Sequence, residues 1–277
     1  MGRQSFKRTL GLARTIALPV IGGLAVFAAF GAPPHYTAVN AAAFLLGLAG
    51  LHFFRLPQAA AAQRAMALVL LAILALPLVT GPELDGARRW LPLGPLTLNS
   101  GLLIAPLLSV LAMRDRAWSW LYLAAGSAVA GLQVDAALAL ALTLAALAWS
   151  YNWRDWKGLL PALFGVAAFI LALRSGGPPP VAFVEGLFPM LWERSAWLAV
   201  GLLALLLTTP IFLLRERELS QRDGSVLGLA FIAFFAVSLF ADYPTPLAGY
   251  GASSILGFML AIAAARRQTT DKKRPET

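Results

Sequence analysis

Long apolar runs separated by short polar stretches repeat along the whole chain. Ten runs are candidates for membrane-spanning helices, at residues 13–31, 38–54, 65–80, 98–113, 117–132, 135–150, 159–173, 187–214, 225–241 and 252–265. A helix satisfies its own backbone hydrogen bonds and crosses the hydrocarbon core with roughly 20 apolar residues. Several runs are shorter, which indicates tilted or re-entrant ends. The pattern predicts an all-α, polytopic membrane bundle forming a single transmembrane domain over residues 1–277.

Two regions depart from this regular alternation. The run at 187–214 is longer than one crossing and carries Pro189 near its start, where proline interrupts a helix. We therefore expect residues 185–195 to form a separate segment at the membrane interface, ahead of the true span. The polar stretch Gln268–Thr277 lacks apolar residues to bury, so we expect a disordered tail.

Composition agrees with a membrane protein and excludes several chemistries. Apolar residues make up 59% of the 277 residues and charged residues 13%, against about 25% charged in soluble domains. The chain has no cysteine, which excludes disulfides, zinc thiolate sites and thiol nucleophiles. Because it has only two histidines, a metal site is not expected. We expect no cofactor; dependence on a divalent metal is an open question at this point.

The net charge of +9 is explained by topology. If the N-terminus is cytoplasmic, only Arg88, Arg89, Arg174 and Arg194 of the 22 Lys and Arg residues fall outside, and the other 18 fall on the cytoplasmic side. This asymmetry follows the positive-inside rule and predicts that both termini are cytoplasmic. The basic residues thus orient the chain among membrane lipids, and no nucleic-acid partner is expected.

Four polar loops then share the extracytoplasmic side, at residues 83–99, 133–135, 174–194 and 242–254. Carboxylates and arginines near the hydrocarbon boundary are costly to bury, which makes them candidates for a functional site. If the loops converge, they bring these charges together. The most distinctive stretch is Gly86–Pro95, with sequence GARRWLPLGP, which sets two adjacent arginines beside a tryptophan and turn-forming Pro and Gly.

Three stretches in these loops resemble motifs of the SEDS family, the RodA/FtsW-type lipid II polymerases. Gly86–Gly94 resembles the family motif GAxRWxxLG, and Tyr243–Ser254, with sequence YPTPLAGYGASS, is similar to the final-loop motif LPxPFxSYGGSS. Gln133–Asp135 resembles QPDLGT at the place expected between spans five and six. Ten spans with both termini in the cytoplasm also fit the topology of this family. The resemblance covers nearly the whole chain, and its first and last motifs are the more specific.

The chain also departs from the family pattern. The family has QPSExxK after the first motif, whereas Asn99–Ala105 reads NSGLLIA and lacks both the acid and the lysine. The loop between spans seven and eight is shorter than in the family, where it presents an essential aspartate in a DFxFAxxxEE-like segment. Aligning Glu193 with the first acid of that closing pair places Glu185 at the position of the aspartate.

The resemblance implies a glycosyltransferase that polymerises lipid II at the outer face of the bacterial inner membrane. Glu185 would act as general base on a sugar hydroxyl, and Arg88 and Arg89 would bind the diphosphate of the undecaprenyl-linked substrate. The expected residues lining the site are Trp90, Asp135, Glu193, Tyr250, Ser253 and Ser254.

Each of these residues also has a purely structural interpretation. Glu185 could be a first-turn helix acid favoured by the dipole, and the two arginines could be interfacial residues that meet lipid headgroups. Asp135 precedes an apolar run, as a helix N-cap does. The stretch from Tyr250 to Ser254 could form a turn followed by an N-cap.

The resemblance also implies a partner, a single-pass penicillin-binding transpeptidase. Two alternative functions stay open. The chain could be a catalytically inactive scaffold or regulator of cell-wall synthesis, which the shortened loop and the missing acid and lysine favour. It could also be a flippase for the lipid-linked precursor, but the spans hold almost no ionisable residues, which disfavours transport. The resemblance implies a role in cell shape or cell division.

Overall fold

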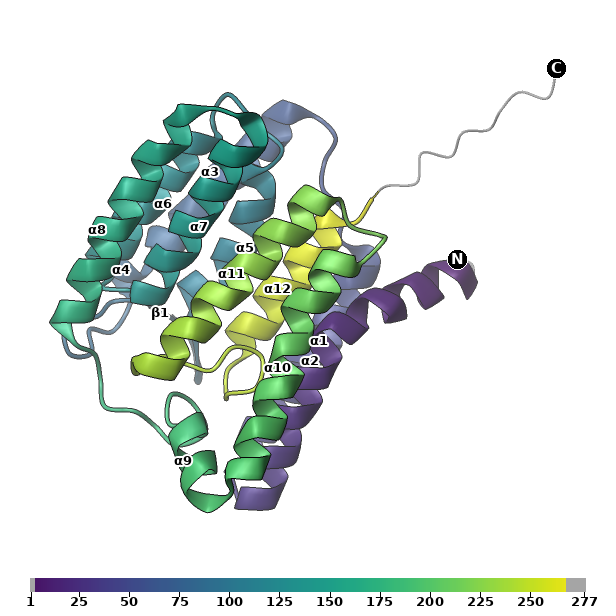
Figure 1. The fold of residues 1–277 in the computed structure, drawn as a ribbon, viewed down its shortest axis with the longest axis vertical. Helices are drawn as coiled ribbons and strands as arrows, with labels where there is room; N and C mark the ends of the chain where they lie inside the picture. The colour runs from purple at the N-terminus through teal and green to yellow at the C-terminus, as the bar shows by residue number, and fades with distance from the viewer. Residues whose placement is uncertain (1–2, 268–277) are drawn as a thin grey trace.

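The computed structural model describes residues 3–267 and is almost entirely helical (Figure 1). The predicted disordered tail at 268–277 lies outside the described residues. The helices are α1 (Arg3–Phe30), α2 (Pro34–Phe53), α3 (Ala60–Ala75), α4 (Pro77–Thr80), α5 (Ser100–Ala112), α6 (Ser119–Leu132), α7 (Ala136–Trp153), the 3-10 turn η1 (Trp156–Gly158), α8 (Leu159–Ser175), α9 (Leu187–Arg194), α10 (Ala196–Arg215), α11 (Gln221–Phe240) and α12 (Ala252–Ala265).

Every predicted span corresponds to a helix or helix pair. Among the described residues, seven helical segments are long and apolar enough to cross a membrane, with α3 and α4 together forming one of them. The other three predicted spans are the shorter apolar helices α5, α6 and α12. The protein is therefore a polytopic membrane bundle. The expected separate segment ahead of the true span is confirmed as α9, but the break comes at Ser195, between Arg194 and Ala196, and Pro189 lies inside α9.

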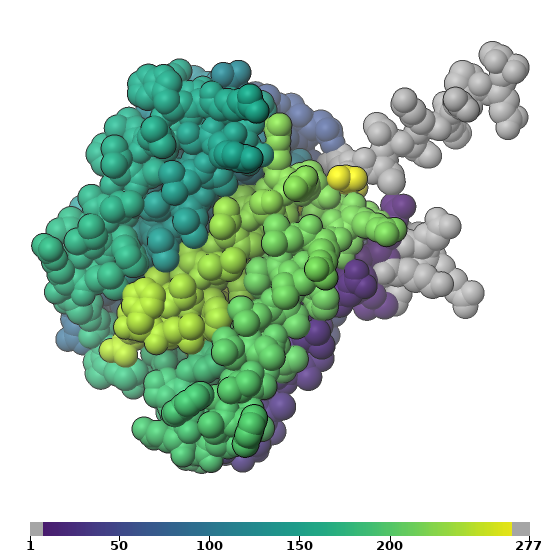
Figure 2. Space-filling view, in the orientation of Figure 1, coloured from purple at the N-terminus to yellow at the C-terminus, as the bar shows by residue number. Residues whose placement is uncertain are grey.

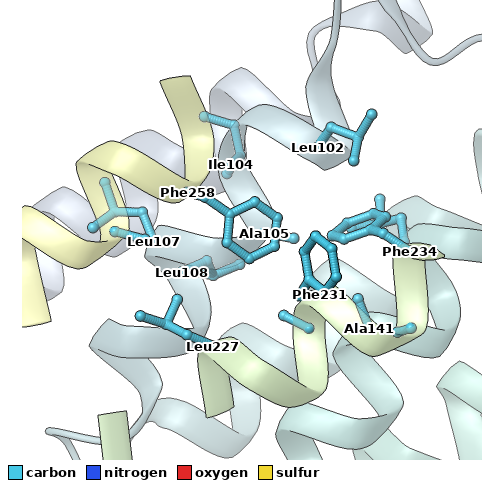
Figure 3. Packing of buried hydrophobic residues seen from close by; sticks show 14 of the residues in the cluster. Leu102, Ile104, Ala105, Leu107, Leu108, Ala141, Leu227, Phe231, Phe234 and Phe258 are labelled. Atoms are coloured by element: carbon cyan, nitrogen blue, oxygen red, sulfur yellow. The ribbon is translucent and has the colours of Figure 1, made fainter. Parts of the chain in front are cut away.

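The core of the bundle lies around α5, α11 and α12. Helices α6, α7 and α8 pack on one side of it, and α1, α2 and α10 lie on the other (Figure 1). Figure 3 shows Phe231 and Phe234 of α11, Phe258 of α12 and Leu108 of α5 meeting in this core, and all four are fully buried. In Figure 2, α11 lies between the teal helices α7 and α8 and the green helix α10.

Glycine allows two core helices to approach closely. A Cβ atom placed on Gly257 of α12 would lie 2.2 Å from the carbonyl oxygen of Leu102 in α5. Small residues at such points are a general means of packing membrane helices. The contact fixes α12 against α5, and both helices begin in loops that build the site described below.

Substituting Gly257→Ala should therefore destabilise the protein by about 1–3 kcal/mol through overpacking. The matched control is Gly201→Ala in α10, where an added Cβ meets nothing within 4 Å. Because alanine favours a helix over glycine, the control should unfold at the wild-type temperature or higher. Thermal unfolding midpoints in detergent measure both effects; an equal response of the two variants contradicts this packing.

The only strands in residues 3–267 form a short hairpin before α5. Strands β1 (Trp90–Leu93) and β2 (Leu96–Asn99) pair antiparallel, with Trp90 opposite Asn99. Gly94 has a φ of +61° at the turn, a conformation that glycine adopts without strain. The sequence indicated turns here but not a hairpin. The pairing delivers Trp90 and Asn99 side by side to the same end of the bundle.

Candidate functional site

The four loops predicted to share one side meet at one end of the bundle, and hydrogen bonds donated by backbone N–H groups connect them. Two of these contacts hold the hairpin region and two hold the final loop. The donors and acceptors are Arg88 N to Gln133 O (3.2 Å), Asn99 N to Ser253 Oγ (2.8 Å), Thr245 N to Val184 O (3.2 Å) and Tyr250 N to Phe183 O (2.7 Å).

A cavity of about 290 Å³ opens among these loops, and we call it the Glu185 cavity. Its wall combines the hairpin, the 178–185 segment, the final loop and Tyr36 of α2. Glu185 is the only charged residue in this lining. The cavity therefore suits an uncharged group that presents a proton to the carboxylate more than it suits an anion.

The Glu185 side chain is half-buried and closes a local turn. Its Oε2 atom accepts a hydrogen bond from the backbone N–H of Val181 at 3.2 Å. Burial raises the pKa of the Glu185 carboxyl above its ordinary value, although the Val181 N–H and the charge of Arg89 act in the opposite direction. Because Glu185 precedes the N-cap residue Gly186, it lies outside the first turn of α9, and the helix-dipole interpretation is wrong.

Arg89 is the most unusual charged residue at this end. Its side chain is buried, with 4% of the residue exposed, and its Nε and Nη2 atoms have no hydrogen-bond partner. The guanidinium lies 4.8 Å from the ring of Trp90 and 4.9 Å from that of Tyr243, within cation–π range. The Nε and Nη2 groups are thus buried donors without acceptors inside the protein, which is uncommon for a charged side chain.

Arg89 lines a second cavity of about 200 Å³, which we call the Arg89 cavity. At three points in the chain, one residue lines the Arg89 cavity and the next residue lines the Glu185 cavity. Arg89, Gly177 and Tyr243 line the Arg89 cavity, and the residue after each, Trp90, Pro178 and Pro244, lines the Glu185 cavity. The two cavities are therefore neighbours that share three backbone segments in their walls.

Arg88 is placed differently from Arg89. Its side chain is exposed and forms an ion pair with Glu83, with Nε donating to Oε2 at 2.8 Å. It lines neither cavity. An exposed pair of this kind contributes little to stability. The two arginines predicted to act together are thus separated, and of these two cavities Arg89 lines one and Arg88 lines neither.

Asp135 is fully buried behind the site and lines neither cavity. One carboxylate oxygen accepts the N–H of Leu138 at 2.9 Å, which confirms the predicted N-cap of α7. The other oxygen accepts the hydroxyl of Tyr243 at 3.2 Å. Because Asp135 is 0% exposed and lines neither cavity, the expectation that it lines the site is corrected, and its charge acts on the neighbouring Arg89.

Glu193 also lies away from the Glu185 and Arg89 cavities. It is an exposed residue of α9 and lines a separate, mainly apolar cavity with Phe188 and Trp192. The expectation that Glu193 lines the site is corrected as well, because Glu193 lies near the end of α9 and faces the cavity that α9 forms with α10.

The final loop contributes three of the expected residues, and Tyr250, Ser253 and Ser254 all line the Glu185 cavity, as does Trp90. Tyr250 stacks on Tyr36 with ring centroids 3.7 Å apart. The hydroxyl oxygens of Ser253 and Ser254 accept the N–H groups of Asn99 and Leu247. The N-cap residue of α12 is Gly251, without a side-chain bond, so the serines do not cap this helix.

Sequence reasoning did not identify Asn99, Thr245 and Asn40. Asn99 caps α5 and Thr245 is 2% exposed, and both line the Glu185 cavity. Asn40 of α2 holds the final loop by donating to Gly249 O and accepting from Gly251 N, each at 3.0 Å. A lone asparagine inside an apolar span was the available signal for Asn40, and an asparagine directly before an apolar run was the signal for Asn99.

Fold and site together define a class, a multi-pass membrane protein with a polar site built by loops at one end of its bundle. Searches found no matching family model and no matching curated protein. Within the residues that the structure describes, no group of three His, Asp or Glu side chains gathers as a possible metal site.

The fold is that of RodA. The rod shape determining protein RodA of Thermus thermophilus superposes with a TM-score of 0.65 at 23% identity, covering 91% of this chain and 93% of that one. A point mutant of that RodA superposes with a TM-score of 0.66 at 21% identity, covering 91% of this chain and 94% of that one. A chain of a peptidoglycan synthase complex that coordinates polymerization and crosslinking superposes with a TM-score of 0.62 at 20% identity. The match covers 92% of this chain and 95% of that one.

Proposed function

We propose that this protein is a SEDS-type peptidoglycan glycosyltransferase, which polymerises a lipid-linked precursor at the outer face of the bacterial inner membrane. One observation carries the proposal. A carboxyl group, Glu185, and a buried guanidinium without acceptors, Arg89, lie in neighbouring cavities at one end of a bundle with the RodA fold. The sequence motifs in the same loops support it.

The chemistry assigns one task to each cavity. The acceptor sugar hydroxyl enters the Glu185 cavity and attacks the anomeric carbon of the undecaprenyl-diphosphate-linked sugar. A new glycosidic C–O bond forms, the bond between the anomeric carbon and the diphosphate oxygen breaks, and Glu185 takes the hydroxyl proton. The diphosphate leaves with the bonding electron pair, and Arg89 stabilises its charge. Arg88, at the surface, has a smaller part in holding the lipid-linked anion.

The proposed partner is a single-pass penicillin-binding transpeptidase. It is supported by the similarity to a chain from a peptidoglycan synthase complex in which polymerization and crosslinking are coordinated.

The second candidate function is a catalytically inactive scaffold of wall synthesis. The absence of the family's acid and lysine between Asn99 and Ala105 favours it. Glycan formation from labelled lipid II by the purified protein, with and without the cognate transpeptidase, separates the two. Long glycan chains that require this protein support the enzyme, whereas an inert wild type that still binds the transpeptidase supports the scaffold. Translocation of the precursor across vesicles without polymerisation would instead indicate a flippase.

The raised pKa of Glu185 predicts a particular pH dependence. A general base works only when deprotonated, so polymerisation should fall as the pH drops through the pKa of Glu185. Because burial raises this pKa, the acid limb should lie at a higher pH than the ordinary glutamate value of 4.5. Initial rates across the acid range measure it. A rate that stays constant down to pH 4.5 contradicts Glu185 as the base.

A further inference from the structure

A further cavity lies between α7 and α11 at the end of the bundle opposite the site. Helix α7 begins directly after Asp135, behind the site, and α11 ends shortly before Asp242, which lines the Arg89 cavity. The two helices pack along each other, so the end of α7 at Trp153 and the start of α11 at Gln221 lie together at the opposite end (Figure 1). A cavity of about 760 Å³ opens there, and we call it the Arg222 cavity.

The lining of the Arg222 cavity changes from apolar to polar toward the end of the bundle. Its apolar part is formed by Leu147 and Ala148 of α7 and by Leu229 of α11, which lies roughly two helical turns inward from the start of its helix. The lining nearer the end consists of Tyr151, Asn152, Ser220, Gln221 and Arg222. This division suits a molecule with a polar headgroup and an apolar chain.

Arg222 supplies the only charge in this lining, and it is an exposed residue that forms no ion pair within residues 3–267. Its guanidinium lies 5.0 Å from the ring of Trp153, a cation–π contact that leaves its N–H groups free for an anion. The adjacent carboxylate of Asp223 is engaged elsewhere, because it pairs with Arg114 at 3.4 Å and accepts the hydroxyl of Ser220 at 2.8 Å. The cavity therefore presents an unneutralised positive charge.

The surroundings of the Arg222 cavity have the character of a membrane interface. Tyr151 is exposed at the end of α7, and aromatic rings of this kind lie at headgroup level in membrane proteins. The exposed basic residues Arg154 and Lys157 follow it, and the acid between them, Asp155, pairs with Arg116 at 3.5 Å. Positive charge is thus in excess here, which favours an anionic headgroup over a zwitterionic one.

We propose that the Arg222 cavity binds an anionic phospholipid, with the lipid phosphate on the Arg222 guanidinium and an acyl chain along Leu147 and Leu229. Arginine offers a planar set of donors that matches phosphate oxygens, and the amides of Asn152 and Gln221 add hydrogen bonds to the headgroup. The lipid contacts α7 and α11 together, so its binding stabilises the packed pair. This site is separate from the two cavities at the other end and does not depend on the proposed function.

The test counts bound lipids on the purified full-length protein in detergent by native mass spectrometry. Dioleoyl phosphatidylglycerol is anionic, whereas dioleoyl phosphatidylcholine has the same chains and a phosphate but no net charge. We expect the wild type to bind the first more tightly than the second, and its unfolding midpoint to rise more with phosphatidylglycerol. Glycerol 3-phosphate, which carries the anion without chains, should not displace the lipid at equal concentration.

Arg222→Gln should reduce the preference for phosphatidylglycerol about fivefold, the effect expected for one basic residue at an anionic headgroup. Arg222→Lys keeps the charge and should retain most of the preference. The matched control is Arg55→Gln, because Arg55 is an exposed arginine after α2, at the same end of the bundle, and does not line the cavity. It should bind both lipids as the wild type does.

Three results overturn this site. The first is equal binding of the two lipids by the wild type. The second is a preference that survives in Arg222→Gln or falls equally in Arg55→Gln, which would assign it to the overall charge of the protein. The third is displacement of phosphatidylglycerol by an equal concentration of glycerol 3-phosphate, which would make the cavity a site for a soluble phosphate. A preference lost only in Arg222→Gln supports the lipid site, whether or not the protein polymerises lipid II.

Discussion

Glu185→Gln is expected to reduce lipid II polymerisation by roughly 100- to 10,000-fold, the range for removing a general base. The same substitution should leave thermal stability unchanged or slightly higher. Glutamine still offers an oxygen to the N–H of Val181, and it removes a carboxylate whose charged form is disfavoured by burial. Folded Glu185 has a raised pKa, so above that pKa its ionisation weakens the folded state, and the neutral amide relieves this cost.

The matched control is Glu193→Gln, which removes one carboxylate from the same outer segment. Glu193 is exposed on α9 and lines neither the Glu185 cavity nor the Arg89 cavity, so its substitution should leave the polymerisation rate near wild type. Glycan gels of labelled lipid II and unfolding midpoints in detergent give both readouts. Comparable activity of Glu185→Gln and Glu193→Gln refutes the assignment of the base.

The second large effect is expected at Arg89. Arg89→Lys keeps a positive charge but loses the planar fork that stacks between Trp90 and Tyr243. Removing a preorganised donor to a developing anion typically lowers kcat by about 100- to 1,000-fold, and we expect a loss of that size. Arg89→Ala should in addition lower the unfolding midpoint, because it leaves the fully buried Asp135 carboxylate without its neighbouring cation.

Arg174→Ala is the control for Arg89, because Arg174 is an exposed arginine at the end of α8 and lines neither cavity. It should polymerise lipid II at the wild-type rate. Arg88→Ala should show an intermediate, smaller loss, since the exposed Arg88 is already paired with Glu83. A loss at Arg88 as large as that at Arg89 would move the diphosphate from the buried cavity to the surface.

The spans could be predicted from the sequence because apolar run length depends on the membrane and not on neighbouring helices. The capping role of Asp135 and the existence of a separate short helix before the span of α10 followed from equally local rules. The convergence of the four polar loops was also foreseeable, since alternating spans return the chain to the same side. Local signals thus sufficed for the elements and for the end of the bundle that holds the polar loops.

The division of the site into two cavities could not be predicted. Arg88 and Arg89 are adjacent in sequence, and only the hairpin and its packing decide that Arg89 is buried between two rings while Arg88 is exposed. The positions of Asn99 and Thr245 in the wall of the Glu185 cavity depend on the same tertiary contacts. The prediction placed Glu193 in the site incorrectly, because an alignment fixes spacing along the chain and not the cavity that a side chain of α9 faces.

The central claim is that one lipid-linked substrate occupies both cavities, with its anion and its sugar divided between them. A structure of the protein with a bound undecaprenyl-diphosphate-linked sugar tests this most directly. The account predicts a diphosphate beside the Arg89 guanidinium in the Arg89 cavity, and a sugar hydroxyl beside the Glu185 carboxylate. A ligand bound at the other end of the bundle, or a diphosphate held away from Arg89, would contradict it.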